Sequence, residues 1–276
     1  MNHKVFDETR IKIMASTMRR NILDMAYECG SSTHLGGGLS IVEIMATLYG
    51  AVMNFDVADP TNAGRDRFIL SKGHGVLGFY AALTQAGIFP LRLLETFQHN
   101  ETDLTSLTVM NANLGIESSN GSLGQGLSMA VGIALYSKLR GKTFNTYVLL
   151  GNGECNEGEV WEAAMSASQF KLDNLTAIVD DNSMQSDGES SQVMDMLSMP
   201  EKFRAFGWDT VSVDGHDISS LYHTIAQRDI NGRPKVVIAK TVKGKGISFM
   251  ENNKDWHHNR LTKSLYEKAI LEIGVS

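Results

Sequence analysis

Two asparagines follow apolar runs in a pattern that can hold a charged ligand. Asn152 lies between Gly151 and Gly153 directly after the run TYVLL, and Asn182 comes after the run LTAIVD. Glycine lets the backbone approach a ligand closely and leaves amide groups free for an anion. The asparagine oxygens suit Mg²⁺, which takes few protein ligands and completes its octahedron with phosphate oxygens and water. The pattern indicates a divalent ion held against a diphosphate, although Gly-Asn-Gly and asparagine are also common in ordinary turns and caps.

Short apolar or β-branched runs, each ending in polar residues or glycine, predict the strands that would position these residues. Helical stretches lie between them, and strands that alternate with helices predict an α/β fold. We expect a doubly wound, mostly parallel sheet with helices on both faces, and ligands beyond the carboxyl ends of its strands. The predicted strands lie near Phe68, Val148, Ile178, Val211 and Val237, and the helices around Ala81, Ala130, Ala164 and Ile225.

The N-terminal part predicts two further helices. Apolar residues recur at spacings of three and four from Ile11 to Cys29, which is typical of a helix with one buried stripe, and the pattern stops at Gly30. A second pattern runs from Ile41 to Leu48 with Ser40 as its expected N-cap. No internal repeat or long linker interrupts the chain, so we expect residues 1–276 to form a single domain.

Composition narrows the class of protein. The chain has 276 residues, of which 42% are hydrophobic, and its formal net charge of −6 argues against binding to nucleic acid or to anionic lipid. Its two cysteines cannot form a disulfide framework, and the N-terminus lacks the apolar core of a secretory signal. No apolar run approaches the ~20 residues needed to cross a bilayer. These features predict a cytoplasmic protein.

Ordered motifs along the chain resemble those of transketolases. The run GNGECNEGEVWEA followed by AIVDDN resembles the family's thiamine diphosphate fingerprint, Gly-Asp-Gly followed further along by Asn. Residues 10–270 carry the resemblance. The other matching segments, in chain order, are SSTHLGG, DRFILSKGHG, GIESSNGSLGQGLSMAVGIAL, VDGHD and GKGISFMENNKDWHH.

The resemblance implies the N-terminal subunit of a split transketolase, which binds the diphosphate of the cofactor. The pyrimidine-binding and C-terminal domains are expected on a separate partner chain, in an assembly with two copies of each polypeptide. Activity would then require the partner. The reaction would transfer a two-carbon ketol unit from a ketose, phosphorylated or otherwise anionic, to an aldose, with thiamine diphosphate and Mg²⁺, or Ca²⁺ or Mn²⁺, as cofactors.

The resemblance also assigns the cofactor-binding residues. Asn152, Asn182 and the backbone carbonyl of Met184 match the metal ligands. The residues that match cofactor contacts are His74, Gly121, Leu123, Gly151, Gly153, Glu154, Asn182 and His257.

Other matching residues would act in catalysis. His34 matches a histidine of the substrate funnel, and His74 and His257 match histidines at the diphosphate or the adjoining substrate; neutral imidazole can relay protons near neutral pH. Glu157 and Glu162 match carboxylates near the interface between subunits. Each has a purely structural alternative: a histidine beside glycine is often structural, and both glutamates could be ordinary acids at a helix N-terminus.

Two departures from the family pattern affect these expectations. Asn152 stands where the family has Asp, which should weaken the metal site unless Glu154 compensates through water. The window TDLTSLTVMNAN contains no histidine, and Leu107 lies where the family has one that contacts substrate, which suggests an unusual donor or acceptor. His99 could replace it from a shifted loop, or could be a plain surface residue.

These departures keep a noncatalytic, partner-binding subunit open as the alternative. A deoxyxylulose-phosphate synthase fits less well because the ending SFMENNKDWHH is more typical of split transketolases. A nicotinamide dehydrogenase is weaker still, because no Gly-x-Gly-x-x-Gly follows an early strand.

Overall fold

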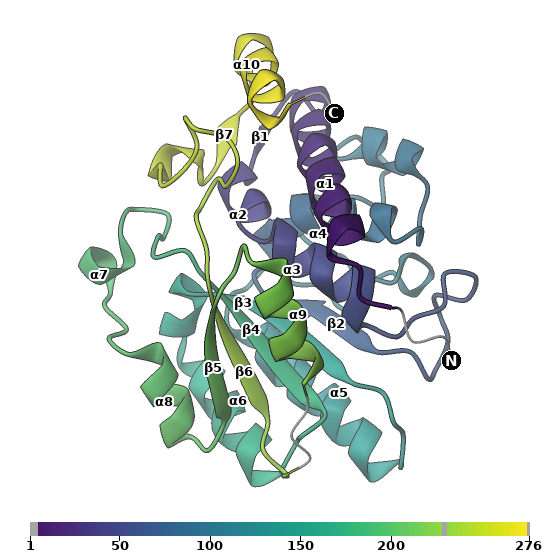
Figure 1. The fold of residues 1–276 in the computed structure, drawn as a ribbon, viewed down its shortest axis with the longest axis vertical. Coiled ribbons are helices and arrows are strands. Elements are labelled where there is room, and N and C mark those ends of the chain that lie inside the picture. Colours follow the sequence, from purple (N-terminus) through teal and green to yellow (C-terminus); the bar gives the residue numbers. More distant parts are fainter. Residues whose placement is uncertain (1–4, 228–230, 275–276) are drawn as a thin grey trace.

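The computed structural model describes residues 5–227 and 231–274, and its centre is a parallel sheet of five strands in the order β2-β3-β4-β6-β5 (Figure 1). All four neighbouring pairs are parallel, as the continuous apolar runs predict. Four of the five strands are almost wholly buried, whereas β5, at one edge, is not. The strands are β2 (Arg67–Leu70), β3 (Thr146–Gly151), β4 (Leu175–Asp181), β5 (Asp209–Asp214) and β6 (Lys235–Lys240).

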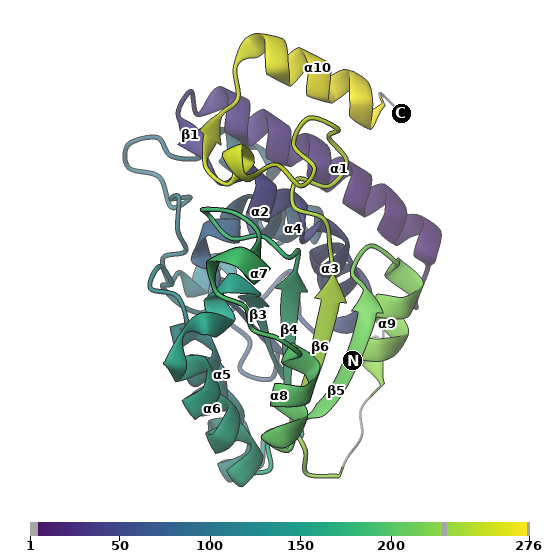
Figure 2. The same ribbon diagram turned by 90° about the vertical axis from the view of Figure 1, so that its left-hand side faces the viewer.

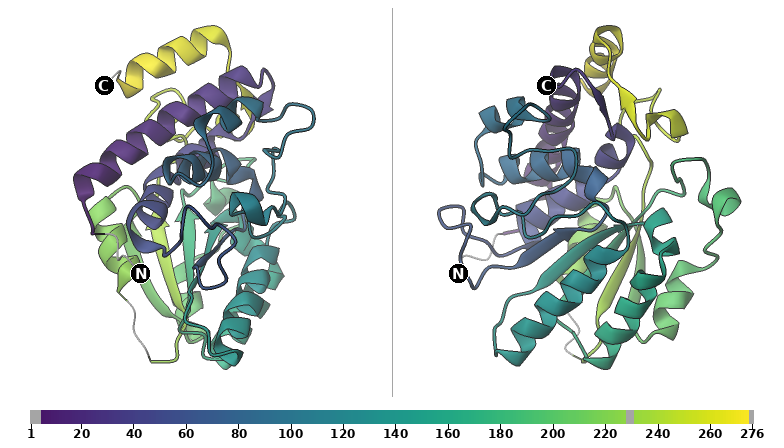
Figure 3. Two further views of the ribbon diagram at one scale, coloured as in Figure 1. Left: turned by 90° about the vertical axis from the view of Figure 1, so that its right-hand side faces the viewer. Right: turned by 180° about the vertical axis from the view of Figure 1, so that it is seen from behind.

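Helices cover both faces of the sheet, so the predicted doubly wound α/β fold is confirmed (Figure 3). One face packs against α1 (Glu8–Glu28), α3 (Val42–Thr47), α4 (Val76–Gln85) and α9 (Ile218–Ala226). The other packs against α5 (Gln125–Leu139), α6 (Gly158–Gln169) and α8 (Met199–Ala205). Alternate strand residues enter the two cores, as Leu149 and Leu150 do on β3.

A small layer lies beyond the carboxyl ends of the strands (Figure 2). There β1 (Ser32–Thr33) pairs antiparallel with β7 (Asn259–Arg260), so an early and a late segment of the chain lie side by side. Helix α10 (Lys263–Ile273) packs on α1. The short α2 (Leu35–Leu39) lies between this layer and the sheet. The remaining short elements are η1 (Leu48–Val52), η2 (Gly73–Gly75), η3 (Leu91–Thr96), η4 (Ala112–Leu114), η5 (Gly153–Asn156), α7 (Ser190–Val193) and η6 (Lys254–Trp256).

The expected N-cap role of Ser40 is wrong. Ser40 ends α2, and its hydroxyl donates to Asp180 Oδ2 at 2.7 Å, while Ile41 precedes α3. The helix before it packs so closely that it needs glycine: a Cβ on Gly36 would lie 2.8 Å from the backbone oxygen of Trp256. In the described part of the chain, no helix combines the length and the apolar character needed to span a bilayer.

Candidate active site

The structure brings the two asparagines together at the carboxyl ends of β3 and β4. Gly151 pairs with Asp180 in the sheet, and the amide of Asn152 donates to the carbonyl of Asp180 at 3.1 Å. Both asparagines are nearly buried and line one hollow of about 620 Å³, together with Met184. The three residues assigned to a metal therefore share one cavity.

The amide groups of both asparagines are tied to protein acceptors. Asn152 Nδ2 donates to the hydroxyl of Ser190 at 2.6 Å, and Asn182 Nδ2 donates to Asp180 Oδ2 at 3.0 Å. Asn182 Oδ1 also accepts from the amide of Met184 at 3.0 Å, so the turn role considered for this residue is present as well. Because both NH₂ groups are engaged, Oδ1 of Asn152 and the second lone pair of Asn182 Oδ1 are left to face a ligand.

A buried ion pair lies beneath the asparagines. Lys72 Nζ lies 2.5 Å from Asp180 Oδ2 and 3.0 Å from the carbonyl oxygen of Gly37, and neither charged side chain is more than 2% exposed. Burial alone would raise the pKa of Asp180, but the charge of Lys72 and hydrogen bonds from Lys72, Thr241 and Ser40 outweigh it and lower the pKa. Asp180 therefore stays ionised and fixes the amide of Asn182.

The predicted histidines His34, His74 and His257 form one cluster. Their ring centroids lie 5.1 to 5.4 Å apart, and His258 lies 4.5 Å from His34. Burial, with the nearby cationic groups, lowers the pKa of His34 to about 4 and that of His257 to about 3, and it also lowers the pKa of His74. These imidazoles are therefore neutral near pH 7 and can donate and accept hydrogen bonds.

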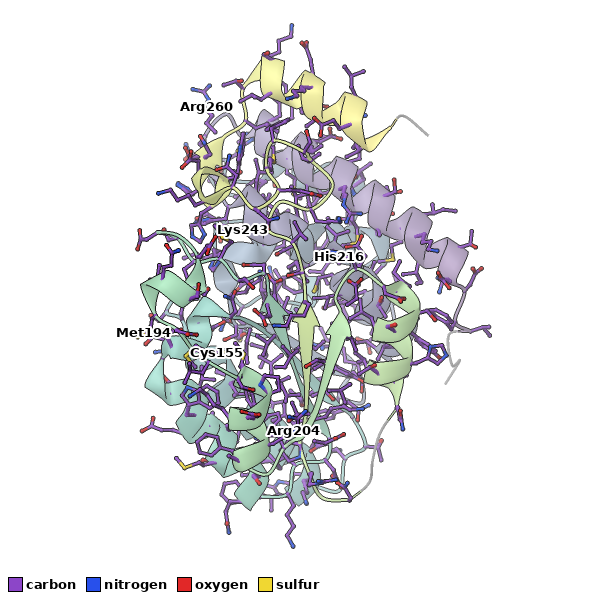
Figure 4. The ribbon with its side chains drawn as sticks, turned by 60° about the vertical axis from the view of Figure 1, so that its left-hand side comes forward. Cys155, Met194, Arg204, His216, Lys243 and Arg260 are labelled. Carbon is purple, nitrogen blue, oxygen red and sulfur yellow. The ribbon has the colours of Figure 1, made fainter. Side chains whose placement is uncertain are left out.

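Lys243 adds a second buried cation beside the histidines. Figure 4 labels it between the sheet and the small layer beyond the strand ends. Its Nζ lies 2.9 Å from His257 Nδ1 and donates to the carbonyl of Gln185 at 3.0 Å. Unlike Lys72, Lys243 forms no ion pair with any residue that the structure describes. Burial and the charge of Lys72 lower its pKa to about 8, so it remains mostly charged at pH 7. A buried ammonium without a counter-ion is costly, and this one favours an anionic ligand.

Gly153 and Gln185 lie against each other next to Lys243, and we call them the glycine cradle. A Cβ on Gly153 would lie 2.9 Å from Cγ of Gln185, so the backbone at Gly153 is open to close approach only because it lacks a side chain. Nε2 of Gln185 is buried and has no hydrogen-bond partner within the described chain. A free amide donor beside a buried cation is suited to an oxyanion.

Glu154 does not face this hollow with a free carboxylate. One oxygen accepts from Ser71 and from the amide of Gly124 at 2.9 Å, and the other accepts from the amide of Gly151 at 2.9 Å. Burial raises its pKa, although these hydrogen bonds oppose the shift. Glu154 therefore links the loops that carry Ser71, Gly124 and Gly151. Whether it offsets, through water, the weaker metal binding expected of Asn152 stays a prediction.

The loop before α5 lies against the histidine loop. A Cβ on Gly73 would lie 2.5 Å from the backbone oxygen of Asn120, which precedes Gly121. Leu123 is partly exposed, and Leu107 lies close enough to Gly121 that an added Cβ would meet its side chain at 3.1 Å. Leu107 therefore borders the loop predicted to contact the cofactor. Its match to the family's substrate-contacting histidine stays a prediction.

Glu157 and Glu162 are not brought into the pocket. Both are exposed at the start and on the outer side of α6. Apolar side chains are exposed on the same layer, among them Met129, Tyr136 and Leu139 of α5 and Met165 of α6. The catalytic part assigned to the two glutamates stays a prediction.

Lys72, Lys243 and His258 contact the predicted site residues or their supports, and the sequence analysis did not single them out. Lys72 follows β2 and Lys243 follows β6, each within three residues of the strand end. The rule that pointed to Asn152 and Asn182 would have found both lysines if it had been applied to every strand.

The fold and this site define a cofactor-binding α/β domain, and comparisons identify its family. Residues 11–274 match the family described as transketolase, thiamine diphosphate binding domain. The chain belongs to this transketolase family, as its motifs predict. The prediction of an N-terminal transketolase-type subunit is confirmed by the relatives below.

The chain is similar to known proteins over nearly its whole length. It is 42% identical to an apulose-4-phosphate transketolase subunit from Actinobacillus succinogenes, over 97% of this chain and 96% of that protein. It is 39% identical to the 6-deoxy-6-sulfo-D-fructose transketolase subunit SqwG from a Clostridium species, over 94% of each. A transketolase structure from Campylobacter jejuni superposes with a TM-score of 0.90 at 26% identity, over 98% of this chain but only 44% of that one.

Thiamine diphosphate fits the residues present. Its anionic tail matches the buried charge of Lys243 and the cradle at Gly153, and a divalent ion matches the side-chain oxygens of Asn152 and Asn182. Within the described residues, no three His, Cys, Asp or Glu side chains are arranged to bind a metal, so a cation here depends on amide and carbonyl oxygens.

Proposed function

We propose that this chain holds the diphosphate of thiamine diphosphate through Mg²⁺ and Lys243, as one subunit of a cytoplasmic transketolase. Asn152, Asn182 and the carbonyl of Met184 would bind the ion. The observation that carries the proposal is that Asn152, Asn182 and Met184 line one hollow. Beside it, Lys243, which forms no ion pair within the described residues, donates to the carbonyl of Gln185, the residue after Met184.

The bound cofactor supplies the carbanion chemistry that breaks and forms the bond to a two-carbon unit. The chain's own residues position the substrate and move protons. His34, His74 and His257 are neutral near pH 7, so each can exchange hydrogen bonds with sugar hydroxyls. The substrate class we propose is an anionic ketose, since both relatives named above act on a phosphorylated or sulfonated sugar.

The remaining domains are proposed to lie on a second chain. The relatives named as transketolase subunits have nearly the same length as this chain, which supports a pyrimidine-binding partner and an assembly of two copies of each polypeptide. The exposed apolar residues on α5 and α6 would be covered in that assembly. Glu157 and Glu162 would then lie near the contact between the two polypeptides.

Calorimetry tests the cofactor site directly. The full chain, with Mg²⁺, should bind thiamine diphosphate and should not bind thiamine, which lacks the diphosphate. Lys243→Met should weaken the binding by at least about tenfold, because it removes the buried ammonium that we propose meets the diphosphate. Lys245→Met, a neighbouring and more exposed lysine, is the matched control and should bind normally.

Equal binding of thiamine and thiamine diphosphate, or equal loss in both lysine variants, would overturn the proposal. The transfer reaction is tested by adding the partner chain and following loss of an anionic ketose. Cofactor binding without turnover in the assembled complex would favour the noncatalytic alternative.

A further inference from the structure

The amide at position 152 has an orientation problem that a carboxylate would not have. A cation needs the oxygen of Asn152, and rotation of the amide by half a turn would present its NH₂ group to the ion instead. Oδ1 of Asn152 accepts no hydrogen bond from the described part of the chain, so no donor holds it from that side. The oxygen can face the hollow only if the nitrogen is held elsewhere.

Ser190 holds that nitrogen. Its hydroxyl oxygen accepts from Asn152 Nδ2 at 2.6 Å, a short and direct contact between the end of β3 and the first residue of α7. An oxygen at this position attracts the NH₂ group and makes the opposite rotamer unfavourable unless the hydroxyl turns to donate. Asn182 has an equivalent support in Asp180.

The position of Ser190 is itself fixed by the loop that follows β4. The Ser190 amide donates to the carbonyl of Ser183 at 2.9 Å, and Gln185 and Gly188 close the turn between them with a bond of 2.8 Å. The loop is tied to η5, the turn after β3, by Asn156, whose Nδ2 donates to the carbonyl of Met194 at 3.2 Å. These hydrogen bonds fix Ser190, the acceptor of the Asn152 amide, at the edge of the site.

We propose that Ser190 is a positioning residue for the metal site, which accepts from Asn152 Nδ2 and so stabilises the rotamer that directs the amide oxygen at the ion. The inference rests on the proposed function, and it adds that the Mg²⁺ affinity depends on the hydrogen bond between Asn152 and Ser190. Ser190 matters because position 152 is an amide, since a carboxylate presents oxygen in either rotamer.

Because this dependence requires an amide at position 152, a double-mutant cycle between positions 152 and 190 is the decisive experiment. The apparent Mg²⁺ affinity is measured on the full chain by calorimetric titration of thiamine diphosphate at several Mg²⁺ concentrations. Ser190→Ala should lower this affinity by about tenfold or more, as is usual when the support of a metal ligand is removed. In the Asn152→Asp background, the same substitution should change it less than about threefold.

Two controls separate orientation from folding. Ser190→Thr keeps a hydroxyl and should retain most of the affinity, whereas Ser191→Ala changes a neighbouring serine and should have no effect. The thermal midpoint of each variant shows whether it is folded at the titration temperature, and affinities are compared only between folded variants.

The outcomes distinguish this inference from the proposed function. If Ser190→Ala costs the same in both backgrounds, or costs nothing, the inference is wrong while the cofactor site stands. If the unsubstituted chain shows no Mg²⁺-dependent binding of thiamine diphosphate, the proposed function is wrong and the inference fails with it.

Discussion

Asp180→Asn should destabilise the chain more than a change at any nearby surface charge. Asp180 is fully buried and accepts hydrogen bonds from Lys72, Ser40, Asn182 and Thr241. The substitution keeps the shape but leaves Lys72 buried without its counter-ion. Removing one partner of a buried pair costs about 3–5 kcal/mol, a large part of the roughly 5–15 kcal/mol that holds a typical domain together.

Urea unfolding measures this loss. With a slope of roughly 3 kcal/mol per molar, at the upper end for small proteins, the midpoint should fall by about 1–2 M. Asp181→Asn is the matched control on the same strand. Its partner Lys240 has a side chain that is 60% exposed, so that pair should contribute only about 0–1 kcal/mol.

The effect should also have a definite pH dependence. Burial would raise the pKa of Asp180, but Lys72 and the other donors lower it overall. A folded pKa below the unfolded value means that the contribution is complete above the unfolded pKa, about 3.9 for Asp, and is lost as pH falls through the folded pKa. The gap between the unsubstituted chain and Asp180→Asn should therefore narrow only in acid. A midpoint change no larger than that of Asp181→Asn would refute the reasoning.

Three other perturbations have equally direct outcomes. Since the pKa of Lys243 is lowered to about 8, thiamine diphosphate affinity should fall as pH rises through that value, and Lys243→Arg should delay the fall in calorimetry; identical profiles would contradict this. Gly126→Ala should cost about 1–3 kcal/mol or more in urea unfolding, because its Cβ would lie 2.6 Å from Cα of Ser71. Tyr136→Asp, at a side chain 53% exposed on α5, should leave stability within about 0.5 kcal/mol but reduce self-association in sedimentation, and unchanged association would exclude this face.

The sheet was predictable because its strands are continuous apolar runs. All five expected strands are present and parallel, and Asn152 and Asn182 meet because β3 and β4 are neighbours both in the chain and in the sheet. That adjacency follows from one strand-helix-strand unit, which sequence patterns describe well.

The rest of the pocket depends on strand order, which the sequence does not specify locally. Lys243 reaches the site because β6 inserts between β4 and β5, out of chain order. His258 reaches His34 because β7 pairs with β1, across almost the whole length of the chain. A lysine is also normally a surface residue, so nothing in its type indicates that it is buried.

The charges of the site bear on the amide at position 152, where the family resemblance leads us to expect Asp. Lys72 is neutralised by Asp180, so it contributes shape and little net charge, whereas Lys243 keeps an uncompensated charge in the pocket. A carboxylate at position 152 would attract the metal but would also repel the diphosphate. With Asn152 the ion would be held less strongly, and the diphosphate would meet a more positive pocket. The two effects have opposite signs, so under the proposed function the change would shift binding energy from the metal to the direct contact of the diphosphate with Lys243.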